Sequence, residues 1–320
     1  MHITVAICTH NRADMLHDSL ETLLAMDRAA DCTFDILVVD NNSTDATPEV
    51  ARRYAAAHPD LISVFRETNV GVVHARNAAF RLARGDVIAF MDDDVLVDCD
   101  WLVNMAEFLR NNSDAACVAG RISGRYEGGR PDWLDSSPAW LNLEGLYSVT
   151  DYGEEDRELT FPEIPIGANM AIRRDVVDRI GGFATSLGRK GRSLLSKEES
   201  EFFFRAKQAG FKTRYASRAR LVHRIPAERC NRKWILRRFY WEGISQVVFD
   251  RLTRGETRQS LKREILSDLR GLVTVVFGRS PSPLAVYWQV KRWRFWHLVF
   301  CVYTYARVRQ RLVHLRQEPT

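Results

Sequence analysis

Three consecutive carboxylates, Asp92-Asp93-Asp94, follow an apolar segment at residues 86–91. Adjacent negative charges repel one another unless a cation or hydrogen-bond donors neutralise them. Carboxylate oxygens suit a divalent ion, Mg²⁺ or Mn²⁺, and such an ion can also bind the oxygens of a diphosphate. The run therefore predicts a metal and phosphate site, and the alternative interpretation is a solvated acidic turn.

Three other polar clusters, at residues 9–12, 40–42 and 69–71, each follow a short apolar segment typical of a buried strand. Segments with helical spacing of apolar residues separate these strands. This alternation predicts an α/β domain with a Rossmann-like, mostly parallel sheet flanked by helices. Ligands of such sheets bind beyond the carboxyl ends of the strands. All four polar clusters are expected at that edge, which makes a solvated turn the weaker interpretation of residues 92–94.

Two residues near these clusters have both a functional and a structural interpretation. Asp40 ends a predicted strand, so its carboxylate suits the base or ribose of a nucleotide, and it equally suits the N-cap of the next helix. Arg76 lies one turn into the helix after Gly71. Its guanidinium can bind a phosphate there or form a surface salt bridge.

Glutamates gather in the segment Glu198-Glu199-Ser200-Glu201, at the start of a predicted helix that Ser196 is expected to cap. Carboxylates at a helix N-terminus are stabilised by the helix dipole, and Glu201 is spaced to pair with Arg205. The functional interpretation is a general base that deprotonates a hydroxyl.

His223 follows residues 220–222, which are predicted to end a strand. A lone histidine is more often structural, but imidazole suits Mn-like ions, so His223 can complete a metal site with Asp94. Between these motifs, residues 121–165 are expected to form loops and short strands over the site, and residues 166–172 a further strand.

Charge divides the chain into two parts. Residues 1–201 hold 20 Lys and Arg against 34 Asp and Glu, a net charge of −14, whereas residues 202–320 hold 26 against 7, a net charge of +19. We therefore expect a catalytic domain at residues 1–225 and a helical, basic and aromatic extension at residues 226–320 that binds an anionic membrane surface. Its apolar segments at 271–278 and 284–305 are interrupted by basic residues, which favours an amphipathic helix in the membrane interface over a spanning helix.

The bulk composition excludes several classes of protein. With 46% hydrophobic and 27% charged residues, the chain is not expected to be disordered. The six cysteines are scattered without a CxxC pair, which argues against a zinc ribbon or a disulfide framework and is typical of a reducing cytosol. Because the chain opens directly on a strand-like segment, we expect a cytoplasmic protein, peripheral on the inner face of the cell membrane.

Six segments together resemble the family-2 glycosyltransferases, which have the GT-A fold and serve bacterial-type polysaccharide and glycan biosynthesis. The resemblance covers roughly residues 3–224. The segments are VAICTHNR (5–12), ILVVDNNSTDAT (36–47), NVGVVHARNA (69–78), GDVIAFMDDDV (85–95), GANMAI (167–172) and EESEFFFR (198–205).

The resemblance implies roles for individual residues. It places Asp94 on the metal, which His223 can join, and Asn169 on the acceptor side. The base position falls on Glu199, where the family usually has Asp, so Glu198 and Glu201 stay open as alternatives. The residues expected around the nucleotide-sugar are Thr9, Asn11, Arg12, Asp40, Asn42, Gly71, Arg76, Asp92 and Asp93.

The implied reaction is an inverting transfer of a hexosyl group from a nucleotide-diphospho-sugar, most simply a UDP-sugar, to a hydroxyl of a glycan or polyprenyl-linked acceptor. Three different functions compete with it. The first is a nucleotide-dependent oxidoreductase, which is disfavoured because no GxGxxG follows the first strand. The second is a metal-dependent sugar nucleotidyltransferase, and the third is a non-catalytic binder of anionic surfaces or nucleic acid through the basic half. Because the tryptophans lie among apolar residues, we expect no nucleic-acid partner.

Overall fold

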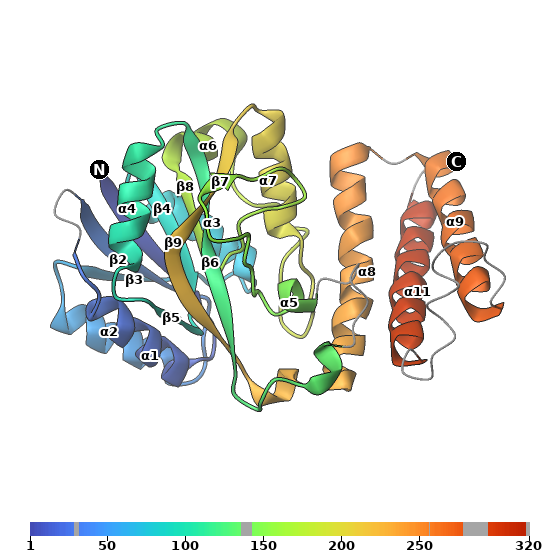
Figure 1. The fold of residues 1–320 in the computed structure, drawn as a ribbon, viewed down its shortest axis with the longest axis horizontal. Coiled ribbons are helices and arrows are strands. Elements are labelled where there is room, and N and C mark those ends of the chain that lie inside the picture. Colours follow the sequence, from blue (N-terminus) through green and yellow to red (C-terminus); the bar gives the residue numbers. More distant parts are fainter. Residues whose placement is uncertain (29–31, 136–142, 256, 278–293, 318–320) are drawn as a thin grey trace.

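A single sheet forms the centre of the molecule in this computed structural model (Figure 1). The structure describes residues 1–28, 32–135, 143–255, 257–277 and 294–317, and these contain nine strands of one sheet. The strands are β1 (His2–Thr9), β2 (Thr33–Asp40), β3 (Ile62–Arg66), β4 (Val87–Asp92), β5 (Val95–Val97), β6 (Ala115–Tyr126), β7 (Arg157–Glu158), β8 (Asn169–Arg173) and β9 (Lys212–Ile225).

The strand order is β3-β2-β1-β4-β8-β6-β9-β5, and β7 pairs with β9. The first four strands of this order are mutually parallel. β8 then runs antiparallel to both β4 and β6, whereas β9 is parallel to β6. The predicted α/β class, with a parallel sheet flanked by helices, is confirmed.

Strand register brings the polar clusters together. Thr9 lies opposite Asp40 on the neighbouring strand β2, and Cys8 lies opposite Asp92 on β4. Because these strands are parallel, their carboxyl ends meet at the same edge of the sheet. The sequence prediction of one shared edge is therefore confirmed by the backbone pairing.

Helices cover both faces of the sheet. The helices of the described residues, including the C-terminal ones that do not cover the sheet, are in chain order α1 (Ala13–Leu24), α2 (Thr47–Ala57), α3 (Val72–Leu82), α4 (Trp101–Asn111), the 3₁₀ turn η1 (Asp132–Leu134), α5 (Leu143–Leu146), α6 (Arg174–Ile180), α7 (Glu198–Gln208), the 3₁₀ turn η2 (Ala227–Arg229), α8 (Arg232–Arg254), α9 (Arg258–Phe277) and α11 (Arg294–Gln317).

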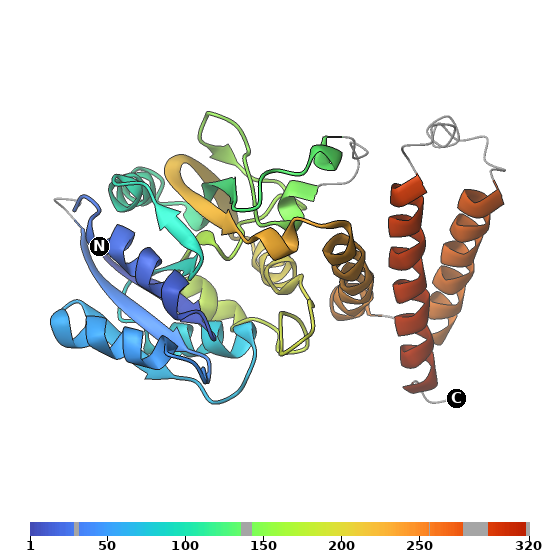
Figure 2. The same cartoon turned by 90° about the horizontal axis from the view of Figure 1, so that it is seen from below.

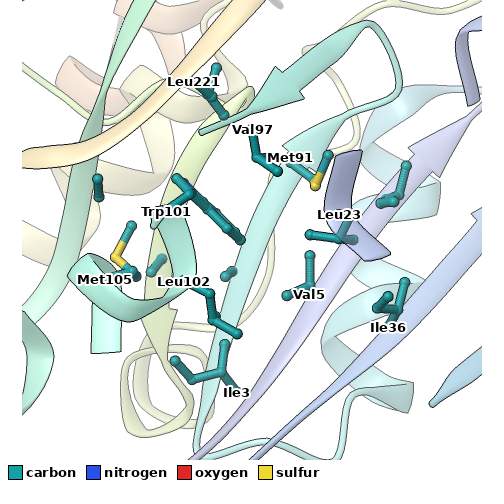
Figure 3. Packing of buried hydrophobic residues seen from close by; sticks show 14 of the residues in the cluster. Ile3, Val5, Leu23, Ile36, Met91, Val97, Trp101, Leu102, Met105 and Leu221 are labelled. Carbon is teal, nitrogen blue, oxygen red and sulfur yellow. The ribbon is translucent and has the colours of Figure 1, made fainter. Parts of the chain in front are cut away.

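Successive side chains of β1 point to opposite faces. Val5 joins the apolar core formed with α1, α2 and α4, whereas Ala6 joins the core formed with α3, α6 and α7. Figure 3 shows the first of these cores, where Val5 lies near Leu23 of α1 and Leu102 of α4. Each fully buried leucine or valine contributes roughly 1.5–3 kcal/mol. This packing on both faces holds in place the strands whose carboxyl ends carry the polar clusters.

Residues 121–165 differ in part from the prediction of loops and short strands, because the long strand β6 continues to Tyr126. Asn169, which is predicted to lie on the acceptor side, is completely buried and does not line the cavity described below. Its Oδ1 accepts a hydrogen bond from Trp101 Nε1 at 3.0 Å, and its Nδ2 donates to the carbonyls of Arg121 and Ala219. Its amide therefore satisfies polar groups of the core.

The C-terminal helices α8, α9 and α11 lie together beside the sheet domain (Figures 1 and 2). An apolar cluster joins them to it, in which Leu143 and Tyr147 pack with Ile235 of α8 and Trp296 of α11. No helix within the described ranges is long and apolar enough to cross a bilayer. Of the predicted amphipathic segments at residues 271–278 and 284–305, residues 278 and 284–293 lie outside those ranges.

Candidate active site

The carboxyl edge of the sheet opens into a cavity of about 670 Å³. The ends of β1 and β4 form one part of its wall, together with the N-terminus of α3. The loop at 189–191, the first turn of α7, η2 and α8 form the rest. Segments from residue 8 to residue 242 therefore meet around one space.

Asp94 is buried and surrounded by positive or potentially positive groups. His223 Nε2 lies 3.2 Å from Asp94 Oδ1, and Arg229 Nη2 lies 3.8 Å from Asp94 Oδ2. Arg12 Nη1 donates a hydrogen bond to Asp94 Oδ2 and another, of 2.9 Å, to Asp93 Oδ1. The acidic run is thus a buried ion cluster, and the interpretation as a solvated turn is wrong.

Asp93 and Asp94, the last two carboxyls of this run, have pKa values that are shifted in opposite directions. Burial raises the pKa of Asp93 to about 6, against the opposing charge of Arg12. Burial acts in the same direction on Asp94, but the charges of His223, Arg12 and Arg229 outweigh it and hold the pKa of Asp94 well below its usual range. Asp94 is therefore an anion near neutral pH.

The donor atoms at this place fit a divalent ion. Asp94 Oδ1 is buried and has no well-formed hydrogen bond in the structure, and an imidazole nitrogen lies beside it. Carboxylate oxygen and imidazole are ligands of Mn²⁺-like ions. No cluster of three or more His, Cys, Asp or Glu suited to a metal occurs among residues that the structure describes. A divalent ion held by Asp94 and His223 would take its other ligands from substrate oxygens or water.

His223 reaches Asp94 from within a strand and not from a strand end as predicted. It belongs to β9, where it pairs with Val95 of β5, and its side chain is buried. Because β5 begins directly after the acidic run, this pairing places the imidazole beside Asp94.

Arg76 is the centre of a second buried ion cluster. Its Nη1 donates to Glu198 Oε1 at 3.1 Å and to Glu199 Oε1 at 2.9 Å, and its Nη2 to Asp92 Oδ1 at 3.4 Å. Only 4% of Arg76 is exposed, so it forms no surface salt bridge. Gly167 is required beside it, because a Cβ there would collide with the guanidinium.

The two glutamates of this cluster differ in charge. Burial, and then the negative charge of Glu199, raise the pKa of Glu198 to about 8. Burial has the same effect on Glu199, but the charge of Arg76 outweighs it and lowers the pKa of Glu199. Near neutral pH the pair therefore holds one proton, on Glu198, and Glu199 is an anion.

Glu201 is separated from this pair. Both of its carboxylate oxygens accept hydrogen bonds from Arg205, at 2.6 and 2.9 Å, as the spacing predicted, and it does not line the cavity. Ser196 does not cap α7, because its hydroxyl donates to Glu242. The helix instead begins after Lys197, whose left-handed backbone (φ 70°) is accompanied by an ion pair with Glu242 at 2.8 Å.

Thr9 and Arg12 of the nucleotide-side prediction line the cavity, as does Gly71. Gly71 has φ +138°, which favours glycine, and its N–H donates to Asn41 Oδ1 at 2.7 Å. Asp40 does not line the cavity. It is buried at the end of β2, where Oδ1 accepts a hydrogen bond from the N–H of Ser43 and Oδ2 has no hydrogen-bond partner.

Asn11 and Asn42 do not line the cavity. Asn11 Oδ1 accepts the N–H of Thr44, and Asn42 Oδ1 accepts Arg66 Nη2, so both side chains hold turns. The cavity-lining asparagine is Asn41, which the sequence interpretation missed. Its amide joins the end of β2 to the start of α3. Residue type alone does not show which of two adjacent asparagines has this role.

Residues beyond 225 also line the cavity, namely Arg229, Arg238 and Glu242. Arg229 lies in η2, and Arg238 pairs with Glu242 on α8 at 2.9 Å. The predicted division at residue 225 therefore leaves part of the site on the extension. The sequence signal for these residues was only the general basic character of this segment.

Known proteins resemble the chain over most of its length. The model of glycosyl transferase family 2 matches residues 4–181. The glucosyl-dolichyl phosphate glucuronosyltransferase of Haloferax volcanii is 27% identical over 263 residues, which are 79% of this chain and 78% of that protein. The succinoglycan biosynthesis protein ExoM of Rhizobium meliloti is 28% identical over 249 residues, 76% of this chain and 73% of that protein.

Among solved structures, the mannosyltransferase PcManGT of Pyrobaculum calidifontis, in complex with GDP-Man and Mn²⁺, has a TM-score of 0.62. The likeness covers 96% of this chain and 86% of that one at 22% identity, and it confirms the GT-A fold. Because the family model spans more than half of the chain, this chain belongs to glycosyl transferase family 2 and is a glycosyltransferase.

Proposed function

We propose that the enzyme moves a sugar from a nucleotide-diphospho-sugar to a hydroxyl of a glycan or lipid-linked acceptor, with inversion at the anomeric carbon. The observation that carries this proposal is the meeting of two clusters in one cavity: Asp94 with His223, and anionic Glu199 with Arg76. A UDP-sugar is the first donor to test and a GDP-sugar the second, because the Pyrobaculum neighbour holds GDP-Man.

Glu199 is the proposed general base. It lines the cavity and is an anion, and Arg76 Nη1 together with the N–H of Gly167 fixes its Oε1. Glu199 takes the proton of the acceptor hydroxyl, whose oxygen attacks the anomeric carbon. The bond from that carbon to the diphosphate oxygen breaks, and the diphosphate leaves with the electron pair. A single displacement of this kind needs no nucleophile on the protein.

The donor side is built from the ends of β1, β2 and β4. Asp40 has a free buried oxygen for a donor on the base or ribose, and Arg12 can donate to the diphosphate. A Mg²⁺ or Mn²⁺ ion held by Asp94 and His223 would supply Lewis-acid stabilisation of the charge on the leaving diphosphate. Arg76 holds its three carboxylates in place and is a positioning residue.

Association with an anionic membrane surface is also proposed, on the surface of α9. Its acidic residues point inward, since Glu264 and Asp268 both pair with the buried Arg311. Its outer face carries leucines that are 55% and 42% exposed, together with exposed basic residues. The outward residues are Lys262, Arg263, Leu266, Leu269 and Arg270. An apolar face rimmed by cations is typical of helices that lie on anionic lipid.

Asp94→Asn is expected to reduce sugar transfer at least about 100-fold, because a neutral amide cannot hold the metal beside the diphosphate. The measurement is donor turnover with added Mn²⁺, together with Mn²⁺ binding followed by electron paramagnetic resonance. Asp98→Asn, at an exposed position after β5, serves as the control. Wild-type turnover that EDTA leaves unchanged would remove the metal from the proposal.

Glu199→Gln is expected to lower kcat by about 10²–10⁴, the usual contribution of a general base. Glu198→Gln should lower kcat much less, because Glu198 is already neutral near pH 7 and glutamine preserves that charge. The two variants are compared in the same transfer assay after thermal melts verify folding. A larger loss in Glu198→Gln than in Glu199→Gln would move the role of base to Glu198.

The stability of the protein should depend on Glu198 between about pH 4.5 and 8. The folded-state pKa is raised to about 8 from an ordinary value of 4.5, so the folded state binds the extra proton. This contribution to the free energy of unfolding is complete below pH 4.5. It is lost as the pH rises to 8, by no more than about 1.4 kcal/mol for each pH unit. Urea unfolding should show wild type losing stability relative to Glu198→Gln over that window, whereas parallel curves would show that Glu198 is not shifted.

Replacing Leu266 and Leu269 together by Gln should weaken binding to phosphatidylglycerol vesicles about tenfold, because less apolar area enters the interface. Vesicle co-sedimentation measures this, and phosphatidylcholine vesicles report the electrostatic part. Leu82→Gln, at a 40% exposed leucine of α3, is the matched control. Unchanged binding of the double variant would show that α9 is not the membrane contact.

A further inference from the structure

Side chains of α8 hold the segment that leads into α7. Arg238 Nη1 donates a hydrogen bond to the carbonyl of Leu194 at 3.3 Å. The hydroxyl of Ser245 accepts the N–H of Ser196 at 3.0 Å. The last backbone groups before Lys197 are therefore fixed by a helix that follows them by about 40–50 residues in the chain.

Glu242 is the centre of this contact. Its Oε1 pairs with Lys197 Nζ at 2.8 Å, whereas its Oε2 accepts the hydroxyl of Ser196 at 2.9 Å and pairs with Arg238 Nη1 at 2.9 Å. Burial opposes ionisation of Glu242, but the charges of Lys197 and Arg238 outweigh it and lower the pKa of Glu242 to about 2. Burial likewise opposes the charge of Lys197, and the charge of Glu242 outweighs it and raises the pKa of Lys197. Glu242 and Lys197 are therefore both charged near neutral pH.

Lys197 has an unfavourable backbone conformation. Its φ of 70° and ψ of 13° lie in the left-handed region, which glycine adopts freely and which costs free energy for a residue with a Cβ. Lysine has no short polar side chain that could stabilise this conformation locally, as asparagine has. The ion pair with Glu242 anchors the ammonium group and so holds Lys197 in this conformation.

The conformation of Lys197 sets the position of Glu199. The carbonyl of Lys197 accepts the N–H of Glu201 at 2.9 Å, so Lys197 begins the hydrogen bonding of α7. Two residues later, Glu199 Oε1 accepts hydrogen bonds from Arg76 Nη1 at 2.9 Å and from the N–H of Gly167 at 3.3 Å. A change in the φ of Lys197 turns the first turn of the helix as a whole and moves Glu199 away from both donors.

We propose that Glu242 is a positioning residue for Glu199, which it holds in place through Lys197. This inference rests on the proposed function, because it takes Glu199 as the general base. Neither Lys197 nor Glu242 lies within residues 4–181, to which the family model matches. The C-terminal extension is therefore a working part of the active site, since its helix α8 fixes the segment from which the base projects.

The test is a double-mutant cycle on the full chain with added Mn²⁺, in which kcat is measured for hydrolysis of UDP-glucose or of GDP-mannose, whichever wild type turns over faster. Glu242→Gln keeps the shape of the side chain and removes its charge. A misplaced base slows the chemical step, so this variant should lower kcat at least about tenfold and change the KM for the donor less than about twofold. Glu107→Gln, at a partly exposed ion pair of α4 outside the cavity, is the control.

Lys197→Gly supplies the second arm of the cycle. Glycine adopts the left-handed conformation without an ion pair, so Glu242→Gln added to Lys197→Gly should lower kcat less than about threefold. Lys197→Ala keeps the unfavourable backbone and has no ion pair, so its kcat should lie at least about threefold below that of Lys197→Gly. Thermal melts verify that each variant is folded.

An equal loss of kcat from Glu242→Gln in wild type and in Lys197→Gly would show that Glu242 does not act through Lys197, and would overturn the inference. A lower melting temperature of Glu242→Gln with unchanged kcat would also overturn it, because a purely structural contact changes only stability. If Glu242→Gln does not fold, Glu242→Asp, which keeps the charge and shortens the side chain, takes its place in the cycle. Near-wild-type kcat in Glu199→Gln refutes the proposed base, whereas coupling between Glu242 and Lys197 in the same assay still supports the role of Glu242 in setting the position of α7.

Discussion

Arg76 is buried within α3, and its guanidinium holds together groups from three separate elements. Asp92 comes from the end of β4, and Glu198 and Glu199 come from the first turn of α7. Removing one partner of such a buried network commonly costs about 3–5 kcal/mol, because an uncompensated charge is left in a low-dielectric place. The donor side and the base side of the cavity therefore have a common support, and each depends on the other for its geometry.

The same network explains why two adjacent glutamates behave differently. Burial, and then the negative charge of Glu199, raise the pKa of Glu198, because a single arginine cannot neutralise three carboxylates. Glu199 keeps its charge because Arg76 Nη1 is closest to it. Burial and the contact with Arg76 therefore decide which of the two adjacent glutamates is an anion.

The C-terminal part is more than an appendage to the transferase domain. η2 supplies Arg229 near Asp94, and α8 supplies Glu242, which pairs with Lys197 at the start of α7. The helix that carries Glu199, the proposed base, is consequently held by the extension. In our proposal the same part also faces the membrane through α9.

The sequence by itself determined the α/β order, the shared edge of the strands and the acidic run, because hydrophobic periodicity and strand-end chemistry are local. The family motifs added the importance of Asp94 and Glu199. Only the tertiary structure decided which asparagine side chains lie at the cavity. Asn41 lines it and Asn42 does not, and the Asn169 amide is hydrogen-bonded within the core. It also decided that Arg229 approaches Asp94 across 135 residues. Side-chain direction, burial and charge partners depend on packing between distant segments, and no local pattern encodes them.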